Sequence, residues 1–112
     1  MVPDLGTFRE KLLARRTELE RETNLAAASR APVELDQTSV GRLSRVDALQ
    51  AQAMAMAQQR RRQSELSAID AALRRIDDGD FGYCLKCGDE IAKARLDNVP
   101  TVTLCIGCAR EA

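Results

Sequence analysis

Apolar residues near the start of the chain recur every three or four positions. The stripe consists of Leu5, Phe8, Leu12, Leu19 and Ala26, interrupted by Arg15 and Glu22. This spacing predicts an amphipathic helix from Asp4 to about Ala28, with a narrow aliphatic face that packs against another helix. Pro3 and Asp4 suit the start of such a helix, because both residue types are favoured around the first turn.

Helical composition returns after Gly41 and meets no glycine or proline before Gly79. A helix of about 35 residues would be roughly 50 Å long at 1.5 Å per residue. Its apolar positions fall into two stretches, Leu66, Ile69, Leu73 and Ile76 near the end and Leu43, Val46, Leu49, Ala53 and Met56 near the start. The two stretches do not share one heptad register, so we expect the apolar stripe to drift around the helix.

The segment between the two helical patterns is rich in residues that favour turns. Ser29, Pro32, Asp36, Thr38 and Ser39 lie in it. It is therefore expected to be a turn or loop. Neither apolar stripe can be buried without the other, so the two helices are predicted to form an antiparallel coiled-coil hairpin.

The two helices of this hairpin differ in length. If Leu5 packs level with Ile76, the second helix extends well beyond the end of the first. We expect residues 32–40 to fold back along residues 41–49. The apolar side chains that would then cover the second helix are Val33, Leu35 and Val40. The alternative is a longer first helix, which Pro32 disfavours because proline disturbs a helix interior.

The charge balance argues against a polyanion as the main target. The 17 basic and 17 acidic side chains cancel, so no net field draws the chain to nucleic acid or to an anionic membrane. The sequence has no signal-peptide pattern and no stretch approaching about 18 apolar residues, so we expect a cytoplasmic protein without a membrane span. Aromatic residues are 3% of the chain, which favours long helices over a layered sheet.

Four cysteines carry the strongest chemical signal. They form two C-x-x-C pairs, Cys84 with Cys87 and Cys105 with Cys108. Each pair can direct two thiolates at one ion, and four thiolates suit a tetrahedral zinc. Four cysteines leave no coordination position for water or substrate, so we expect one structural zinc ion that replaces a hydrophobic core. Nearby cations either offset the charge of this centre or are ordinary surface residues: Lys86, Lys93 and Arg95.

Catalysis finds little support in the sequence. The chain has no histidine and no glycine-rich phosphate loop, so we expect no enzymatic activity. A thiol oxidoreductase is disfavoured, because such enzymes usually place one C-x-x-C pair at the start of a helix in a βαβ unit. A sensor that releases zinc when its thiolates are oxidised stays open as an alternative.

The cysteine-containing segment resembles a known family. The run Asp80-Phe81-Gly82-Tyr83-Cys84, followed by Cys87-Gly88, Ile91, Arg95-Leu96, Pro100, Leu104-Cys105 and Cys108, is similar to the zinc finger of the DksA/TraR family of bacterial transcription regulators. The similarity covers about residues 77 to 110. It implies direct binding to RNA polymerase, with the coiled-coil tip entering the secondary channel, often together with ppGpp. It also implies that promoter DNA is not contacted.

The tip of the hairpin departs from the family pattern. Better-known members carry D-x-x-D-x-A at the tip, and in the nearest stretch of this chain, Ser44 to Leu49, only Asp47 matches. We still expect the end distal to the zinc to decide activity through Asp36, Arg42, Arg45 and Asp47. The competing hypotheses are a zinc-stabilised coiled-coil adaptor for another protein, a thiol-based sensor and a nucleic-acid-binding zinc protein.

These patterns together predict a mainly α fold with two parts. Residues 1–78 form an antiparallel coiled-coil hairpin whose tip spans about residues 29–50, and residues 79–112 form a small four-cysteine zinc-finger module. A structural zinc and an RNA polymerase partner are the functional expectations to be tested.

Overall fold

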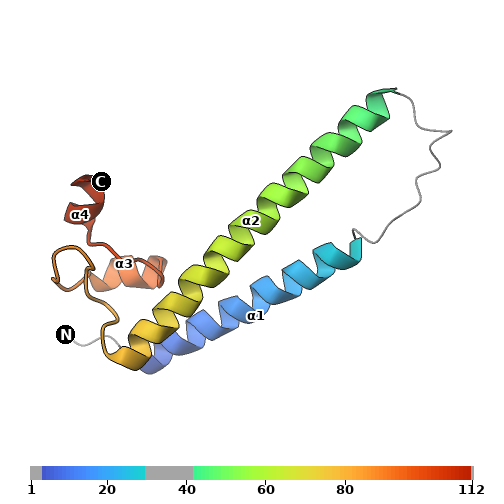
Figure 1. Cartoon of the computed structure of the whole chain (residues 1–112). Coiled ribbons are helices and arrows are strands. Elements are labelled where there is room, and N and C mark those ends of the chain that lie inside the picture. Colours follow the sequence, from blue (N-terminus) through green and yellow to red (C-terminus); the bar gives the residue numbers. More distant parts are fainter. Residues whose placement is uncertain (1–3, 30–41, 112) are drawn as a thin grey trace. The chain divides into compact units, whose positions relative to one another are not determined.

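The chain is described by a computed structural model over residues 4–29 and 42–111. Four helices follow one another: α1 (Leu5–Ser29), α2 (Arg42–Asp78), α3 (Lys93–Asn98) and α4 (Ile106–Glu111) (Figure 1). In this part of the chain the only β pairing is an isolated antiparallel bridge between Tyr83 and Glu90. The predicted mainly α fold with a C-terminal four-cysteine module is confirmed.

Helix α1 begins and ends within one residue of the predicted positions. Asp4 lies just before it, and its carboxylate accepts hydrogen bonds from the Thr7 hydroxyl at 2.7 Å and from the Thr7 backbone N–H at 3.3 Å. Both hydrogen bonds lower the pKa of Asp4, and the bond from the hydroxyl has the larger effect. Asp4 thus satisfies an amide that no helical carbonyl can reach, which is the role of a capping residue.

The chain divides into two compact units. The first comprises Met1–Arg16 with Leu66–Ala112, and the second comprises Thr17–Glu65. Both long helices contribute to both units, so the first unit is assembled from the two ends of the chain. The predicted division at residue 79 between a hairpin and a zinc module stays a prediction.

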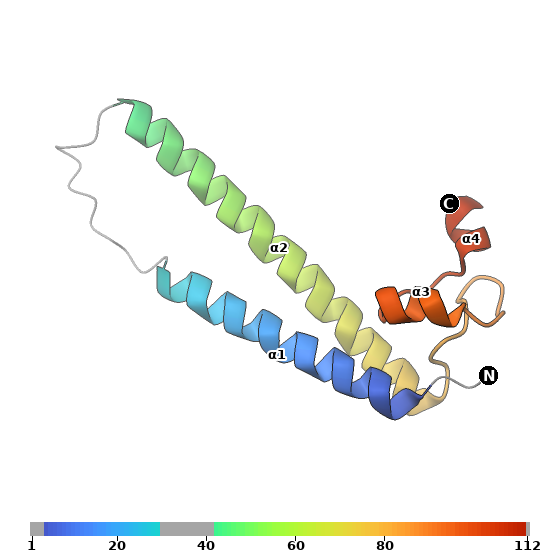
Figure 2. The same cartoon turned by 180° about the vertical axis from the view of Figure 1, so that it is seen from behind.

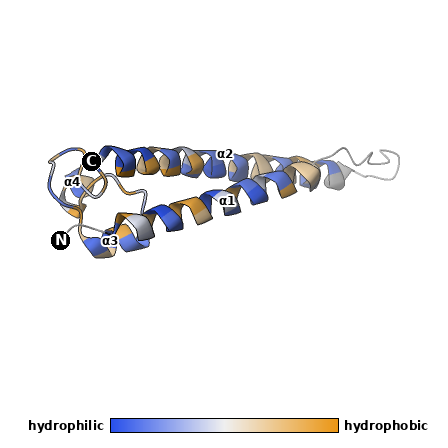
Figure 3. Cartoon of the chain, turned by 90° about the horizontal axis from the view of Figure 1, so that it is seen from below, coloured by the Kyte–Doolittle hydropathy of each residue, from blue (hydrophilic) through white to orange (hydrophobic). Residues whose placement is uncertain are grey.

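The core of the first unit combines both helices with the segment that follows α2. Its buried side chains include Phe8, Leu12, Ile69, Ala72, Ile76 and Phe81. The ring centroids of Phe8 and Phe81 lie 5.2 Å apart, and the ring planes meet at 48°. Aromatic pairs favour tilted arrangements of this kind. The chain after α2 therefore covers the start of α1. Hydrophobic and hydrophilic residues are interspersed along both helices (Figure 3), as expected where apolar residues recur every three or four positions.

Two ion pairs show the register of α1 against α2 in the first unit. Arg9 pairs with Asp77, and Arg16 pairs with Asp70 at 3.6 Å. The residue numbers in each pair add to 86, so the helices run antiparallel, as Figure 2 also shows from behind. A level pairing of Leu5 with Ile76, as assumed from the sequence, differs from this register by more than a helical turn. The start of α1 instead lies level with the residues just beyond α2, because Phe81 packs on Phe8.

In the second unit, the predicted apolar stripe at the start of α2 is not a buried seam. Leu19 of α1 is buried, but Val46, Leu49 and Met56 are about half exposed or more. Helix α1 has 25 residues and α2 has 37, so by the register seen in the first unit the first turns of α2 have no described α1 residue level with them. The expected covering of α2 by residues 32–40 lies outside the described residues.

No helix within residues 4–29 and 42–111 combines the length and the apolar character needed to cross a lipid bilayer.

The buried positions of α2 predict a graded loss of stability. Ile69 is 1% exposed, so Ile69→Ala should lower the free energy of unfolding by about 2–4 kcal/mol through lost burial and a new cavity. Leu73, which is half-buried, should cost less when changed to alanine. Leu49→Ala is the matched control and should stay within about 0.5 kcal/mol, because Leu49 is exposed.

Denaturant titrations followed by helical circular dichroism, at saturating zinc, give these values. Equal losses for Ile69→Ala and Leu49→Ala would show that Ile69 does not belong to the helix interface.

Candidate metal centre

A tight turn after α2 directs the chain into the cysteine-containing segment. The carbonyl of Arg75 accepts hydrogen bonds from the N–H groups of Asp80 at 2.8 Å and Phe81 at 3.1 Å. Gly79 supports this turn with a φ of 82°, a backbone conformation that side-chain-bearing residues rarely adopt. The turn places Phe81 against α1 and leaves Cys84 only three residues further along. Burial lowers the pKa of the Arg75 side chain.

The first C-x-x-C pair lies in a short loop closed by backbone hydrogen bonds. The N–H of Cys84 donates to the carbonyl of Asp89 at 2.8 Å, and the N–H of Gly88 donates to the carbonyl of Cys84 at 2.9 Å. Gly88 has a φ of 80°, so a residue with a side chain would be strained at this position. The bridge between Tyr83 and Glu90 closes the base of the loop. In this loop the Sγ atoms of Cys84 and Cys87 lie within 4.8 Å of each other.

The second C-x-x-C pair lies at the start of α4. The carbonyl of Cys105 accepts the N–H of Ala109 at 2.9 Å, which is helical pairing. The N–H of Cys108 points at the sulfur of Cys105, at 3.4 Å. This contact links the two cysteines of the second pair at the first turn of the helix.

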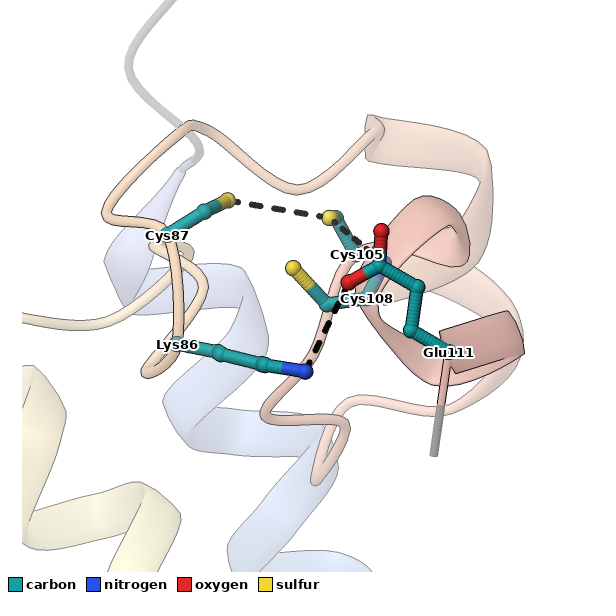
Figure 4. Close-up of polar contacts among 5 residues, drawn as sticks. All are labelled: Lys86, Cys87, Cys105, Cys108 and Glu111. Carbon is teal, nitrogen blue, oxygen red and sulfur yellow. Dashed lines mark hydrogen bonds and ion pairs between the residues drawn. The ribbon is translucent and has the colours of Figure 1, made fainter.

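The fold brings all four cysteines together. Their Sγ atoms lie within 4.8 Å of one another, and those of Cys87 and Cys105 are 3.8 Å apart (Figure 4). Four sulfurs at about 2.3 Å from a tetrahedral zinc would be separated by about 3.8 Å. Cys84 and Cys108 are buried, Cys105 is half-buried and Cys87 is exposed. The donor set and its dimensions therefore fit one zinc ion with a closed coordination shell.

The surroundings of the thiols shift their pKa values in opposite directions. The pKa of Cys84 falls to about 6, because the backbone N–H of Cys87 and then that of Cys105 donate hydrogen bonds to its sulfur. The pKa of Cys108 rises to about 12, first because of its hydrogen bond with the Cys105 sulfur and then because of burial. The N–H of Asp89 favours the Cys87 thiolate, but the Cys84 sulfur and burial outweigh it, so the pKa of Cys87 is raised. Neighbouring sulfurs thus oppose the formation of further thiolates. A bound cation is needed to balance the charge when all four are deprotonated.

Two side-chain contacts near the centre were not expected from the sequence. Arg95 of α3 donates from Nε to the carbonyl oxygen of Leu104 at 2.9 Å. Lys86, between the cysteines of the first pair, forms a 3.5 Å ion pair with Glu111 of α4 (Figure 4). From the sequence, Arg95 and Lys86 could be recognised only as cations near the cysteines. Their partners, the Leu104 carbonyl and the Glu111 carboxylate, cannot be identified without the fold.

The predicted tip residues that the structure describes and the metal centre belong to different units of the chain. Arg45 and Asp47 belong to the second unit and are exposed on α2, whereas the cysteines belong to the first unit. Arg42 begins α2, but its side chain lies outside the described residues, as does the whole of Asp36. The structure thus gathers the predicted metal ligands and leaves Arg45 and Asp47 accessible to solvent.

Comparison with known proteins identifies the same centre. The family described as prokaryotic dksA/traR C4-type zinc finger matches residues 79–112, which include all four cysteines. The RNA polymerase-binding transcription factor DksA of Caulobacter vibrioides is 31% identical over 102 residues, 91% of this chain and 70% of that protein. One structural zinc ion is therefore the cofactor of this chain.

Solved structures of similar proteins share the fold. Transcription factor DksA2 from Pseudomonas aeruginosa superposes with a TM-score of 0.74 at 28% identity, covering 96% of this chain and 81% of that one. The DnaK suppressor protein from Agrobacterium tumefaciens gives a TM-score of 0.62 at 29% identity, covering 100% of this chain and 96% of that one. The likeness thus extends over the helices as well as the cysteine-containing segment.

The closed four-sulfur geometry predicts that zinc is needed for local folding. Cys84→Ser and Cys108→Ser should each abolish stoichiometric zinc binding and disorder residues 80–110, because metal-binding energy is folding energy in so small a module. The parent protein should contain one zinc per chain. Metal analysis by mass spectrometry and amide NMR spectra give the two readouts.

The control is the parent protein treated with a chelator, which should reproduce the spectra of the variants while retaining the circular dichroism of the long helices. An ordered finger in a zinc-free variant would refute a structural role for the metal.

Proposed function

The chain belongs to the DksA/TraR family, and on that premise we propose that it binds RNA polymerase directly and regulates transcription. The observation that carries this proposal is the 31% identity to a DksA protein across 91% of the chain. That similarity includes both long helices as well as the zinc finger. The chain would act by binding and not by catalysis, and would work in the cytoplasm, where RNA polymerase is found.

The zinc ion in this proposal is held by Cys84, Cys87, Cys105 and Cys108. Their mutual distances support it, since all four sulfurs lie within 4.8 Å of one another. When bound, zinc cross-links the two C-x-x-C pairs. It offers no coordination position to water or substrate, because four thiolates complete its coordination. The residues of the chain provide the amides that favour the thiolate of Cys84.

Helix α2 is suited to reach into a channel of the polymerase. It has 37 residues without interruption, a length of about 55 Å at 1.5 Å per residue. Near its start Arg45 and Asp47 are exposed, and so are Val46, Leu49 and Met54. An exposed surface with both charges and flexible apolar side chains is suited to a protein partner. We propose that this end enters the secondary channel and that Asp36, Arg42, Arg45 and Asp47 contact the polymerase there.

The same proposal assigns ppGpp to the interface between this chain and the polymerase, and it assigns no specific contact to DNA. The equal numbers of basic and acidic residues support the second point, since DNA binding draws its affinity mainly from neutralised phosphates. Binding of the free protein to duplex DNA should therefore be weak at moderate salt.

A zinc-stabilised adaptor for another protein is the second candidate function. The exposed apolar residues Val46, Leu49 and Met56 favour it, because a helical protein partner of any kind could cover them. Capture of purified core RNA polymerase by the immobilised chain separates the two functions. Retention of the polymerase supports regulation, and no retention at micromolar concentrations supports the adaptor.

The decisive experiment for regulation is transcription in vitro with purified polymerase. Run-off assays on a responsive promoter and an unresponsive one, with and without the chain and ppGpp, should show a promoter-dependent change that requires the chain. Equal transcription in all reactions would refute the proposal even if the two proteins bind.

A single charge at the start of α2 predicts a separation of binding from effect. Asp47→Asn nearly preserves size and removes one negative charge that would lie near the phosphates and magnesium of a polymerase active site. It should leave the melting temperature and polymerase binding almost unchanged but weaken the transcriptional effect several-fold. Titration of the variant in run-off transcription measures this.

Asp97→Asn is the control, because Asp97 is also an exposed helical aspartate but belongs to the first unit. It should behave as the parent protein. Full activity of Asp47→Asn across the titration would exclude an acidic-tip mechanism, even with RNA polymerase as the partner.

A further inference from the structure

The two residues before the second C-x-x-C pair are held from two different directions. The carbonyl of Thr103 accepts the N–H of Leu85, in the first pair, at 2.8 Å. The carbonyl of Leu104 accepts Nε of Arg95, from α3, at 2.9 Å. The first contact joins the two cysteine pairs through the backbone. The second depends on a single side chain and so can be removed by substitution.

The Leu104 carbonyl has a direct geometric relation to the next residue, Cys105. The carbonyl carbon and oxygen of one residue and the nitrogen and Cα of the next lie in one rigid peptide plane. A hydrogen bond that fixes the Leu104 oxygen therefore restricts the orientation of the plane that carries the Cα of Cys105. The direction of its Cβ and Sγ depends on that plane, and this Sγ lies 3.8 Å from the Sγ of Cys87.

Arg95 is itself firmly placed. The N–H groups of Arg95 and Leu96 both donate to the carbonyl of Ala92, at 3.0 and 3.1 Å, and the carbonyl of Arg95 accepts the N–H of Val99 at 2.9 Å. Leu96, the next residue, is 2% exposed and anchors α3 in the core of the first unit. The Arg95 side chain is half-buried, so its hydrogen bond competes with less water than one at the surface would.

We infer that Arg95 is a positioning residue for the zinc ligand Cys105, acting through its hydrogen bond to the Leu104 carbonyl. Outer contacts of this kind orient metal ligands, and their loss typically costs about 10–100-fold in metal affinity. The inference rests on the four-cysteine ligand set proposed above. It does not depend on RNA polymerase being the partner.

The neighbouring cations differ from Arg95 in what they contact. Lys86 is exposed and pairs with the exposed carboxylate of Glu111, an interaction that water screens. Lys93 is exposed on the same short helix as Arg95. If the positive charge on α3 were what matters, loss of either Lys93 or Arg95 would weaken zinc binding. If the hydrogen bond matters, only Arg95 contributes.

The test compares three variants of the full chain: Arg95→Met, Arg95→Lys and Lys93→Met. Zinc affinity is measured by competition with a chromophoric chelator, and the rate of zinc release is measured by transfer to excess chelator. Arg95→Met should bind zinc about 10–100-fold more weakly and release it faster. Lys93→Met, which removes the same charge from the same helix, should match the parent protein. Arg95→Lys, which keeps the charge and a donor, should recover part of the loss.

Cobalt substitution gives a readout that a general loss of stability would not change. Co²⁺ bound by four thiolates has visible absorption bands that depend on the geometry around the ion. The bands of cobalt-saturated Arg95→Met should shift or broaden, whereas those of Lys93→Met should overlay the parent spectrum. Circular dichroism at saturating metal should show intact long helices in all variants.

Two results would overturn the inference. Equal weakening by Arg95→Met and Lys93→Met would assign the effect to charge, and parent-like affinity and spectra for Arg95→Met would remove any role for the hydrogen bond. A parent protein without stoichiometric zinc would instead refute the ligand set, and the two failures are therefore distinguishable.

Discussion

A shortage of apolar side chains after α2 is the constraint on which the rest of the first unit depends. Among residues 79–111, the buried aromatic and aliphatic side chains are Phe81, Ile91 and Leu96, with Cys84 and Cys108 beside them. Three such side chains bury too little apolar surface to offset the conformational entropy of ordering some thirty residues. In so small a segment the free energy of zinc binding by thiolates is also free energy of folding. The metal therefore supplies most of the stabilisation of this segment.

The few apolar residues of the segment serve to attach it to the helices. Phe81 packs on Phe8, and the turn that aims it there is closed by two hydrogen bonds to the Arg75 carbonyl. Three residues later the chain reaches the first thiol. Packing against the hairpin and metal binding thus meet within a single four-residue stretch, and the register of α1 against α2 follows from where Phe81 must lie.

The parts of the structure that sequence reasoning predicted are those governed by local pattern. The limits of α1, the uninterrupted length of α2 and the four-cysteine cluster follow from helical spacing, from glycine and proline positions and from ligand chemistry. The helix register could not be predicted, because it depends on Phe81 returning to α1 from outside the helical pattern. The stripe at Val46 and Leu49 looked like a seam, since apolar spacing does not reveal whether a partner helix extends that far. Arg95 was recognised as a cation, but its acceptor is a backbone carbonyl, which leaves no mark in the sequence.

The assembly of the first unit from both ends of the chain has a consequence for how such proteins can change in length. The metal centre, the aromatic pair and the two ion pairs involve only residues of Met1–Arg16 and Leu66–Ala112. The intervening residues act as an insertion into that unit. Matched additions or deletions of whole helical turns, one in each long helix, would keep the facing sides in phase and leave every contact of the first unit intact. The length of the two long helices can thus change in evolution without disturbing the metal centre.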